Sequence, residues 1–98
     1  MEMLYVKNGI MPVIKATRRE FIACYRDYVF CHACESDESA FTDMFYIPTI
    51  DCVFCKHCAD LYAKDAIIYK IDRKKAQKNY LDMRQKMIDI GTWEEIRE

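Results

Sequence analysis

The feature that most constrains this chain is the spacing of its cysteines between residues 31 and 58. Cys31 and Cys34 form one C-x-x-C pair, while Cys52, Cys55 and Cys58 form two further pairs that overlap. Two cysteines spaced in this way can point inward from one tight turn, and two such turns supply four thiolates to a tetrahedral zinc ion. The spacing therefore predicts one Zn²⁺ that acts as a structural cross-link.

The second half of this site has two possible pairs, Cys55 with Cys58 or Cys52 with Cys55. A helix is expected to begin at the later pair, where free N–H groups and the positive end of the helix dipole would stabilise thiolates. Phe54 would then be the last apolar strand residue before the metal turn. The favoured ligands are Cys31, Cys34, Cys55 and Cys58, with the pair Cys52 and Cys55 as the open alternative.

The remaining cysteines and both histidines have ordinary structural interpretations. Cys24 shares a helical face with Phe21 and is expected to be a small buried residue. Cys52, if it is the cysteine left over, would be a buried thiol or a support for the site. His32 and His57 lie inside their C-x-x-C turns, at positions that usually face solvent, although either could replace one cysteine in the metal shell.

The six cysteines of this 98-residue chain could instead form three disulfides. Residues 1–7 contain neither a long apolar run nor a basic segment, so no secretory signal is predicted. No stretch approaches the roughly 18 apolar residues of a membrane span. These observations favour a cytoplasmic protein with reduced thiols and no membrane association. The formal net charge of −1 gives no bulk attraction to nucleic acid or anionic lipid.

Turn and capping signals predict the elements before the cysteines. Asn8-Gly9 separates two apolar runs, residues 4–6 and 10–14, as in a β-hairpin, and Pro12 places its strand at an edge. Thr17 and Glu20 form a capping box that begins a helix, which is expected to run to about Phe30.

A short strand pair or irregular hairpin is expected from Phe41 to Ile50, with Pro48 inside it. The tail is predicted to be helical from an N-cap at Asp72 to a stop at Gly91. A second capping box, Thr92 with Glu95, predicts a last turn over residues 93–97.

Apolar residues in the tail follow a heptad pattern, widened by Leu81 and Ile88. The steps of four and three residues define one seam. This seam is expected to pack onto the rest of the chain as core, although it could instead pair with a partner helix or a second copy. Its members are Ala76, Tyr80, Met83, Met87 and Ile90.

Residues 54–64, from Phe54 through Cys55, Cys58 and Asp60 to Lys64, resemble the second knuckle of GATA-type and other treble-clef zinc fingers. In that family a C-x-x-C knuckle is followed by a β-hairpin and then by a helix that carries the second pair. The resemblance covers about residues 28–70. It implies an α+β fold with a treble-clef-like zinc module, although the chain lacks the basic, Trp-containing hairpin of the GATA type. We expect one domain, comprising an N-terminal hairpin and helix (1–30), the zinc module (31–70) and C-terminal helices (71–98).

Motifs of zinc enzymes are missing from the sequence. Residues 35–50 contain no histidine of the kind that HNH-type nucleases place between their knuckles. The H-x-E and P-C-x-x-C motifs of zinc deaminases and the H-E-x-x-H motif do not occur. A catalytic zinc also keeps one position open, whereas four cysteines can close the site. We therefore expect a protein that is not an enzyme.

Two kinds of partner remain. Abundant Tyr and Met, with Trp93, favour a protein-interaction module, an adaptor or inhibitor that docks on another macromolecule. The alternative is a nucleic-acid-binding module that uses a basic patch in an otherwise acidic chain. The oligomeric state stays open. The patch comprises Lys70, Arg73, Lys74, Lys75 and Lys78.

Overall fold

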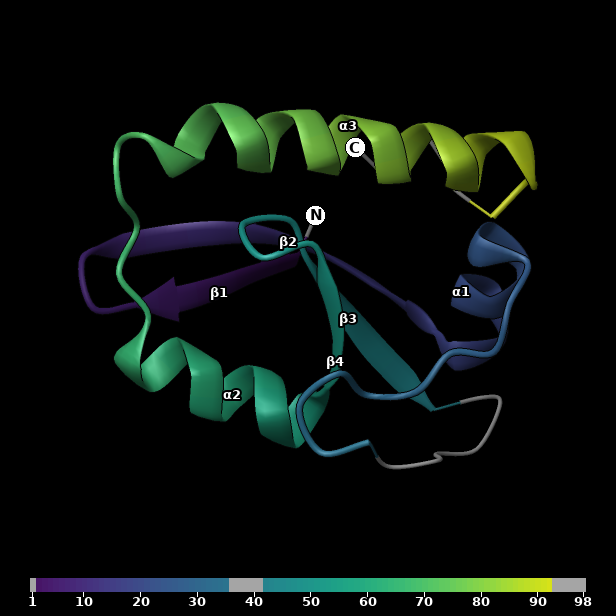
Figure 1. Ribbon diagram of the computed structural model, residues 1–98, viewed down its shortest axis with the longest axis horizontal. Coiled ribbons are helices and arrows are strands. Elements are labelled where there is room, and N and C mark those ends of the chain that lie inside the picture. Colours follow the sequence, from purple (N-terminus) through teal and green to yellow (C-terminus); the bar gives the residue numbers. More distant parts are fainter. Residues whose placement is uncertain (1, 36–41, 93–98) are drawn as a thin grey trace.

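The computed structural model of the protein describes residues 2–35 and 42–92. Four strands and three helices follow one another along these residues (Figure 1). The elements are β1 (Glu2–Val6), β2 (Gly9–Thr17), α1 (Arg18–Tyr25), β3 (Asp43–Ile47), β4 (Cys52–Cys55), α2 (Lys56–Asp65) and α3 (Asp72–Asp89). The α+β class expected from the sequence is therefore confirmed.

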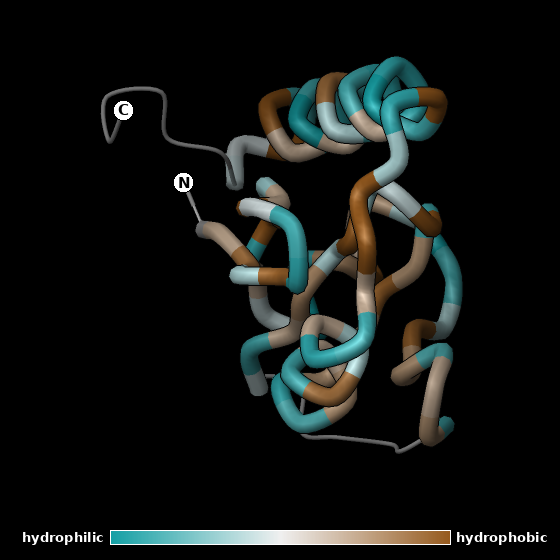
Figure 2. The backbone as a smooth tube through the Cα atoms, turned by 90° about the vertical axis from the view of Figure 1, so that its left-hand side faces the viewer, coloured by the Kyte–Doolittle hydropathy of each residue, from teal (hydrophilic) through white to brown (hydrophobic). Residues whose placement is uncertain are grey.

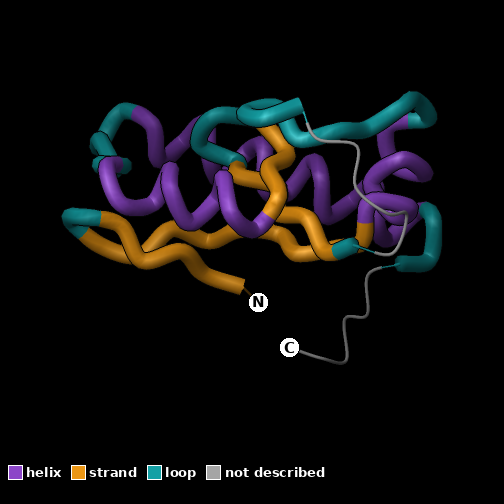
Figure 3. Tube along the Cα trace, turned by 90° about the horizontal axis from the view of Figure 1, so that it is seen from below, coloured by secondary structure: helices purple, strands orange, loops and turns teal. Residues whose placement is uncertain are grey.

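One antiparallel sheet with the strand order β1-β2-β3-β4 joins the N-terminal hairpin to the cysteine region. The hairpin predicted around Asn8-Gly9 is present, with Val6 opposite Gly9. Strand β2 continues beyond its partner β1 and pairs with β3 from Ile14 to Thr17. Figure 3 shows this long hairpin extending from the rest of the sheet. Because β2 belongs to both pairings, it fixes the position of the hairpin relative to the cysteines. The expectation that Pro12 places its strand at an edge is wrong for β2 as a whole, which is an inner strand, but Pro12 lies in the part of β2 that pairs with β1 and not with β3.

Both faces of the sheet are covered, as the consecutive buried residues Val13 and Ile14 of β2 indicate. Successive side chains of a strand point to opposite faces. Val13 packs in a cluster with Ala59 and Ala63 of α2. Ile14 belongs to a second cluster, which includes Phe21 of α1 and Met83 and Met87 of α3. In Figure 1 the sheet accordingly lies between α2 and α3.

Helix α1 begins as predicted and ends earlier than predicted. The Thr17 hydroxyl accepts a hydrogen bond from the Glu20 N–H (3.2 Å), and the Glu20 carboxylate accepts one from the Thr17 N–H (2.8 Å). The expected extension to Phe30 is wrong, because Arg26 takes a left-handed conformation with φ 56°. Its N–H donates to the Ile22 carbonyl and closes the last turn. A residue in this conformation at a helix end is usually glycine, so an arginine at this position gives no sign in the sequence that the helix ends.

The strand pair expected within residues 41–50 is displaced along the chain. Of that range, β3 covers Asp43–Ile47, and its hairpin partner β4 begins only at Cys52. Pro48 has no N–H to donate to a ladder and lies in the turn between the two strands. The apolar stretch that looked like two strands is thus one strand and a turn.

Helix α3 differs from the prediction at its start and agrees at its end. Asp72 is the first helical residue and not the N-cap, because a backbone turn from Tyr69 leads directly into the helix and leaves Ile71 already helical. Gly91, with φ 78°, ends the helix as expected, and the Thr92 N–H donates to the Met87 carbonyl. The predicted turn at residues 93–97 lies outside the described residues.

The expected seam of α3 packs on the sheet through its central members. Met83 is 3% exposed and Met87 1%, and Tyr80 packs against the same core. Ile90 and Leu81 are exposed, so the buried stripe is narrower than the heptad pattern predicts. Figure 2 shows hydrophobic residues separated by hydrophilic ones along α3. None of the described helices has the length and apolar character that crossing a membrane would require.

Candidate metal centre

The first C-x-x-C pair lies in a tight turn that follows a short irregular segment after α1. The Glu35 N–H donates to the Cys31 carbonyl over 2.8 Å and closes the turn. Glu35 has φ 57°, a left-handed conformation that lets the chain turn sharply after Cys34. This turn presents Cys31 and Cys34 to the same side.

Backbone hydrogen bonds hold this turn against β4. The His32 N–H donates to the Val53 carbonyl, and the Val53 N–H donates to His32 Nδ1, each over 2.9 Å. His32 is exposed, as expected, and its ring also takes part in this contact with β4. His32 Nδ1 also lies 3.1 Å from the Val53 carbonyl oxygen. No signal in the sequence announces this role.

The second C-x-x-C pair lies where β4 becomes α2. Cys55 is the N-cap of the helix and Cys58 lies in its first turn. The positive end of the helix dipole is therefore next to both sulfurs, as the sequence analysis expected. The Cys55 N–H also donates to Cys31 Sγ over 3.3 Å, which connects the two turns directly.

The four sulfurs of Cys31, Cys34, Cys55 and Cys58 all lie within 4.8 Å of one another. The sulfurs of Cys34 and Cys55, which belong to different turns, are 3.9 Å apart. Tetrahedral zinc with Zn–S bonds of about 2.3 Å holds its sulfurs about 3.8 Å apart. The cluster could thus hold a metal ion with little movement, and four soft thiolates are the donor set that zinc accepts.

Burial makes the thiols of Cys55 and Cys58 costly to ionise without a cation. Cys31, Cys55 and Cys58 are buried, and Cys34 is exposed. Burial raises the pKa of the Cys55 and Cys58 thiols above their ordinary value of 9.0, and neighbouring sulfurs raise that of Cys58 further. Four thiolates this close repel one another, so a divalent cation is the natural compensation.

Cys52, Cys24 and His57 lie outside this cluster. Cys52 is half-buried, and its thiol donates to the Ile50 carbonyl over 3.2 Å. Cys24 is also half-buried, packs against the core beside α3 and has its thiol pKa raised by that burial. All six cysteines carry free thiols, and His57 is exposed. The structure thus groups the favoured four cysteines and leaves the alternative ligand Cys52 apart.

The basic patch is exposed and lies around the N-terminal half of α3. No ion pair within the described residues involves Lys70, Arg73, Lys74 or Lys75, whereas Lys78 pairs with Asp82 over 3.2 Å. Successive helical residues point about 100° apart, so the three consecutive cations from Arg73 surround the helix and do not form one stripe.

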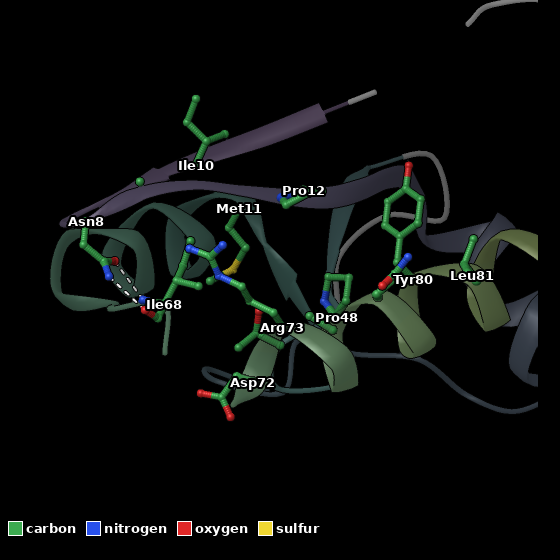
Figure 4. Close-up of a pocket in the computed structure, with 14 residues that line it drawn as sticks. Asn8, Ile10, Met11, Pro12, Pro48, Ile68, Asp72, Arg73, Tyr80 and Leu81 are labelled. Carbon is green, nitrogen blue, oxygen red and sulfur yellow. Dashed lines mark hydrogen bonds between the residues drawn. The ribbon is translucent and has the colours of Figure 1, made fainter. Parts of the chain in front are cut away.

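An apolar groove of about 470 Å³ runs between the tip of the β1–β2 hairpin and α3. Figure 4 shows Ile10, Met11 and Pro12 from the hairpin side and Tyr80 and Leu81 from α3 around it. At one end the Asn8 side-chain amide donates to the Ile68 carbonyl, and its oxygen accepts from the Ile68 N–H, both over 2.8 Å. This groove was not predicted from the sequence, where Leu81 in the apolar seam of the tail was the one signal of it.

Comparison with family models, curated proteins and solved structures finds no match to this chain. Fold and site together define a small α+β protein with a four-stranded antiparallel sheet and a cluster of four cysteines that could hold a metal ion.

Proposed function

We propose that the chain is a structural-zinc protein with a treble-clef organisation. The order of its parts supports this: the turn with Cys31 and Cys34, the β3–β4 hairpin, and then a helix that carries Cys55 and Cys58. The grouping of the four sulfurs within 4.8 Å of one another is the single observation that carries the metal assignment. Removing the metal would unfold the region, since such sites contribute on the order of 10 kcal/mol.

The zinc in this proposal has a structural role only. Four thiolates fill a tetrahedral shell and leave no position for water or a substrate, which a catalytic zinc needs. Cys55 and Cys58 join the ion to α2, while Cys31 and Cys34 join it to the segment after α1. The ion therefore holds two parts of the chain together, and the protein is not an enzyme.

The surface supports docking on another protein. Among the residues at the groove, Ile10 is 51% exposed and Leu81 48%. Ile71, just before α3, is 86% exposed. Apolar side chains of a partner protein could bury these residues, and such burial is the main favourable term in protein association. We infer an adaptor or inhibitor that presents this groove.

A matched pair of leucines tests the docking surface. Leu81 lies at the groove, whereas Leu61, on α2 and 47% exposed, lies elsewhere. Tagged wild-type protein, Leu81→Glu and Leu61→Glu would be used to capture proteins from the native host. A partner that wild type and Leu61→Glu retain and Leu81→Glu loses is expected. Capture of no specific protein, or equal capture by all three, would refute the docking proposal.

Nucleic-acid binding is the second candidate, favoured by the exposed cations of the basic patch that lack ion pairs within the described residues. Lys74→Gln with Lys75→Gln should then weaken DNA or RNA binding and flatten its salt dependence by about two charges. Lys56→Gln, which removes a cation already paired with Asp60, is the control. No binding of wild type at low salt would exclude this function.

A further inference from the structure

A second pocket, of about 250 Å³, lies beside the first cysteine turn. Four aromatic rings and two carboxylates line it, and no Lys or Arg is among the described residues of its lining. Such a combination of apolar ring faces with negative charge is the opposite of an anion site. The lining residues that matter are Tyr25, Tyr28, Phe30, His32, Asp27 and Asp51.

Three of the rings form a connected series. The Tyr28 and Phe30 ring centroids are 5.8 Å apart with their planes at 42°, and those of Phe30 and His32 are 6.3 Å apart at 39°. Tyr28 is 57% exposed and Phe30 37%. Covering the exposed part of these rings with a ligand would be favourable. The face of an aromatic ring carries partial negative charge and attracts cations.

Neither carboxylate of the pocket has a cationic partner within the described residues. Asp27 Oδ1 accepts a hydrogen bond from the Tyr28 N–H over 2.7 Å, and Asp51 accepts one from the Tyr46 hydroxyl. A carboxylate has about four acceptor positions, so each keeps capacity for a further donor. The negative charge of the pocket is therefore available to a ligand.

A buried arginine contacts two of the residues that line this pocket. Arg18 is 8% exposed, and its Nε–H donates to the Val29 carbonyl over 2.6 Å. Its guanidinium carbon lies 4.8 Å from the centroid of the Tyr28 ring. Lys86 Nζ similarly lies 5.4 Å from the Tyr25 ring. Arg18 thus contacts both Val29 and the Tyr28 ring, and two of the rings of the pocket lie close to cations.

We propose that this pocket binds a cationic side chain, an arginine or a lysine, presented by a partner protein. The ring faces would cover the apolar stem, and the Asp27 and Asp51 carboxylates would accept the N–H donors of the charged end. This inference rests on the proposed role as a protein-interaction module and specifies the chemistry of its partner. It concerns a different surface from the groove at Leu81.

Short peptides test the pocket without knowledge of the partner. The probes are acetyl-Gly-Arg-Gly amide and acetyl-Gly-Lys-Gly amide, each with a neutral counterpart that carries citrulline or acetyl-lysine. Two-dimensional NMR of the ¹⁵N-labelled, zinc-loaded protein would follow the amides of residues 27–32 and 51. Saturable shifts with a charged probe, and none with its neutral counterpart, are expected. Equal shifts with the neutral peptides, or none with either charged peptide, would overturn the proposal.

Substitutions locate the effect. Phe30→Leu keeps an apolar side chain but removes a ring face, and should weaken binding of the charged peptide about two- to five-fold. Tyr28→Phe keeps the ring and should bind as wild type. Asp27 is exposed, so Asp27→Asn removes a carboxylate charge without disturbing the core. This variant should fold as wild type does and bind the charged peptide more weakly. Unchanged affinity in both Phe30→Leu and Asp27→Asn would refute the site.

The proposed docking function can survive failure of this inference. A host protein that Leu81→Glu loses, and that Phe30→Leu captures as well as wild type does, would leave the groove as the docking surface and exclude the cation pocket. Binding of the charged peptides with no host partner captured would support the cation pocket and exclude the groove as a docking surface.

Discussion

The Cys55 backbone N–H donates a hydrogen bond to Cys31 Sγ over 3.3 Å, across 24 positions of the sequence. Such a bond places a backbone donor beside one of the four clustered sulfurs. It also joins the first cysteine turn to the start of α2. The shape of the candidate metal centre is therefore partly built into the backbone, and the metal would complete it.

The capping box of α1 should contribute measurably to stability. Thr17→Ala removes the acceptor for the Glu20 N–H and should lower the free energy of unfolding by about 0.5–2 kcal/mol. Thr17→Ser, which keeps a hydroxyl, is the control and should lose less. Urea denaturation of the zinc-loaded proteins measures both. Equal losses in the two variants would mean that the methyl group matters more than the cap.

The Asn8 side chain should tie the hairpin to the segment between α2 and α3. Asn8→Ala breaks both hydrogen bonds to Ile68 and should destabilise the protein by about 1–2 kcal/mol. Asn8→Asp keeps the acceptor for the Ile68 N–H and should cost less. Hydrogen exchange at the Ile68 amide should quicken in the alanine variant, and an unchanged rate would contradict the contact.

Packing of α3 on the sheet should depend on its buried methionines. Met87→Ala at 1% exposure should destabilise the protein by about 2–5 kcal/mol, since it leaves a cavity. Leu81→Ala, at an exposed position of the same helix, should cost much less. Thermal or urea unfolding would compare them, and a cost at Met87 as small as that at Leu81 would mean that α3 is not held by this core.

High pH should unfold the protein through its buried tyrosines. Burial raises the pKa of Tyr46 and of Tyr25 above the ordinary value of 10.0, and the hydrogen bond to Asp51 raises that of Tyr46 further. Above pH 10.0 the unfolded chain loses these protons first, so the stability present below that pH falls as pH rises towards the folded-state values. The slope should reach about 1.4 kcal/mol per pH unit for each tyrosine.

Tyr46→Phe separates this effect from the titration of cysteines, which both proteins share. The variant should be less stable at neutral pH because Asp51 loses its donor, yet its stability should fall less steeply above pH 10. Denaturant titrations at several pH values measure the two slopes. A slope identical to that of wild type would contradict ionisation of Tyr46 as a cause.

Local signals allowed much of this architecture to be predicted from the sequence. Asn8-Gly9 fixes a turn through backbone conformation, Thr17 with Glu20 begins a helix, and Gly91 ends one, each with partners within a few residues. The choice of Cys58 over Cys52 as the partner of Cys55 followed from the helix that was expected to begin there. Each of these features is determined by residues that lie close together in the sequence.

Features set by distant contacts could not be predicted in this way. The end of α1 at Arg26 has no glycine to mark it, and the pairing of β2 with β3 joins segments separated by more than 25 positions. The bond between His32 and the Val53 N–H likewise depends on how β4 meets the first cysteine turn. The groove and the aromatic pocket exist only once those contacts have formed.

The zinc content of purified cysteine variants tests the central claim most directly. Wild type and Cys52→Ser should each contain one zinc per chain and keep the native fold, since Cys52 lies apart from the four clustered sulfurs. Cys58→Ser should lose the zinc and the fold of the cysteine region. Retention of zinc and fold by Cys58→Ser, with their loss in Cys52→Ser, would contradict the account.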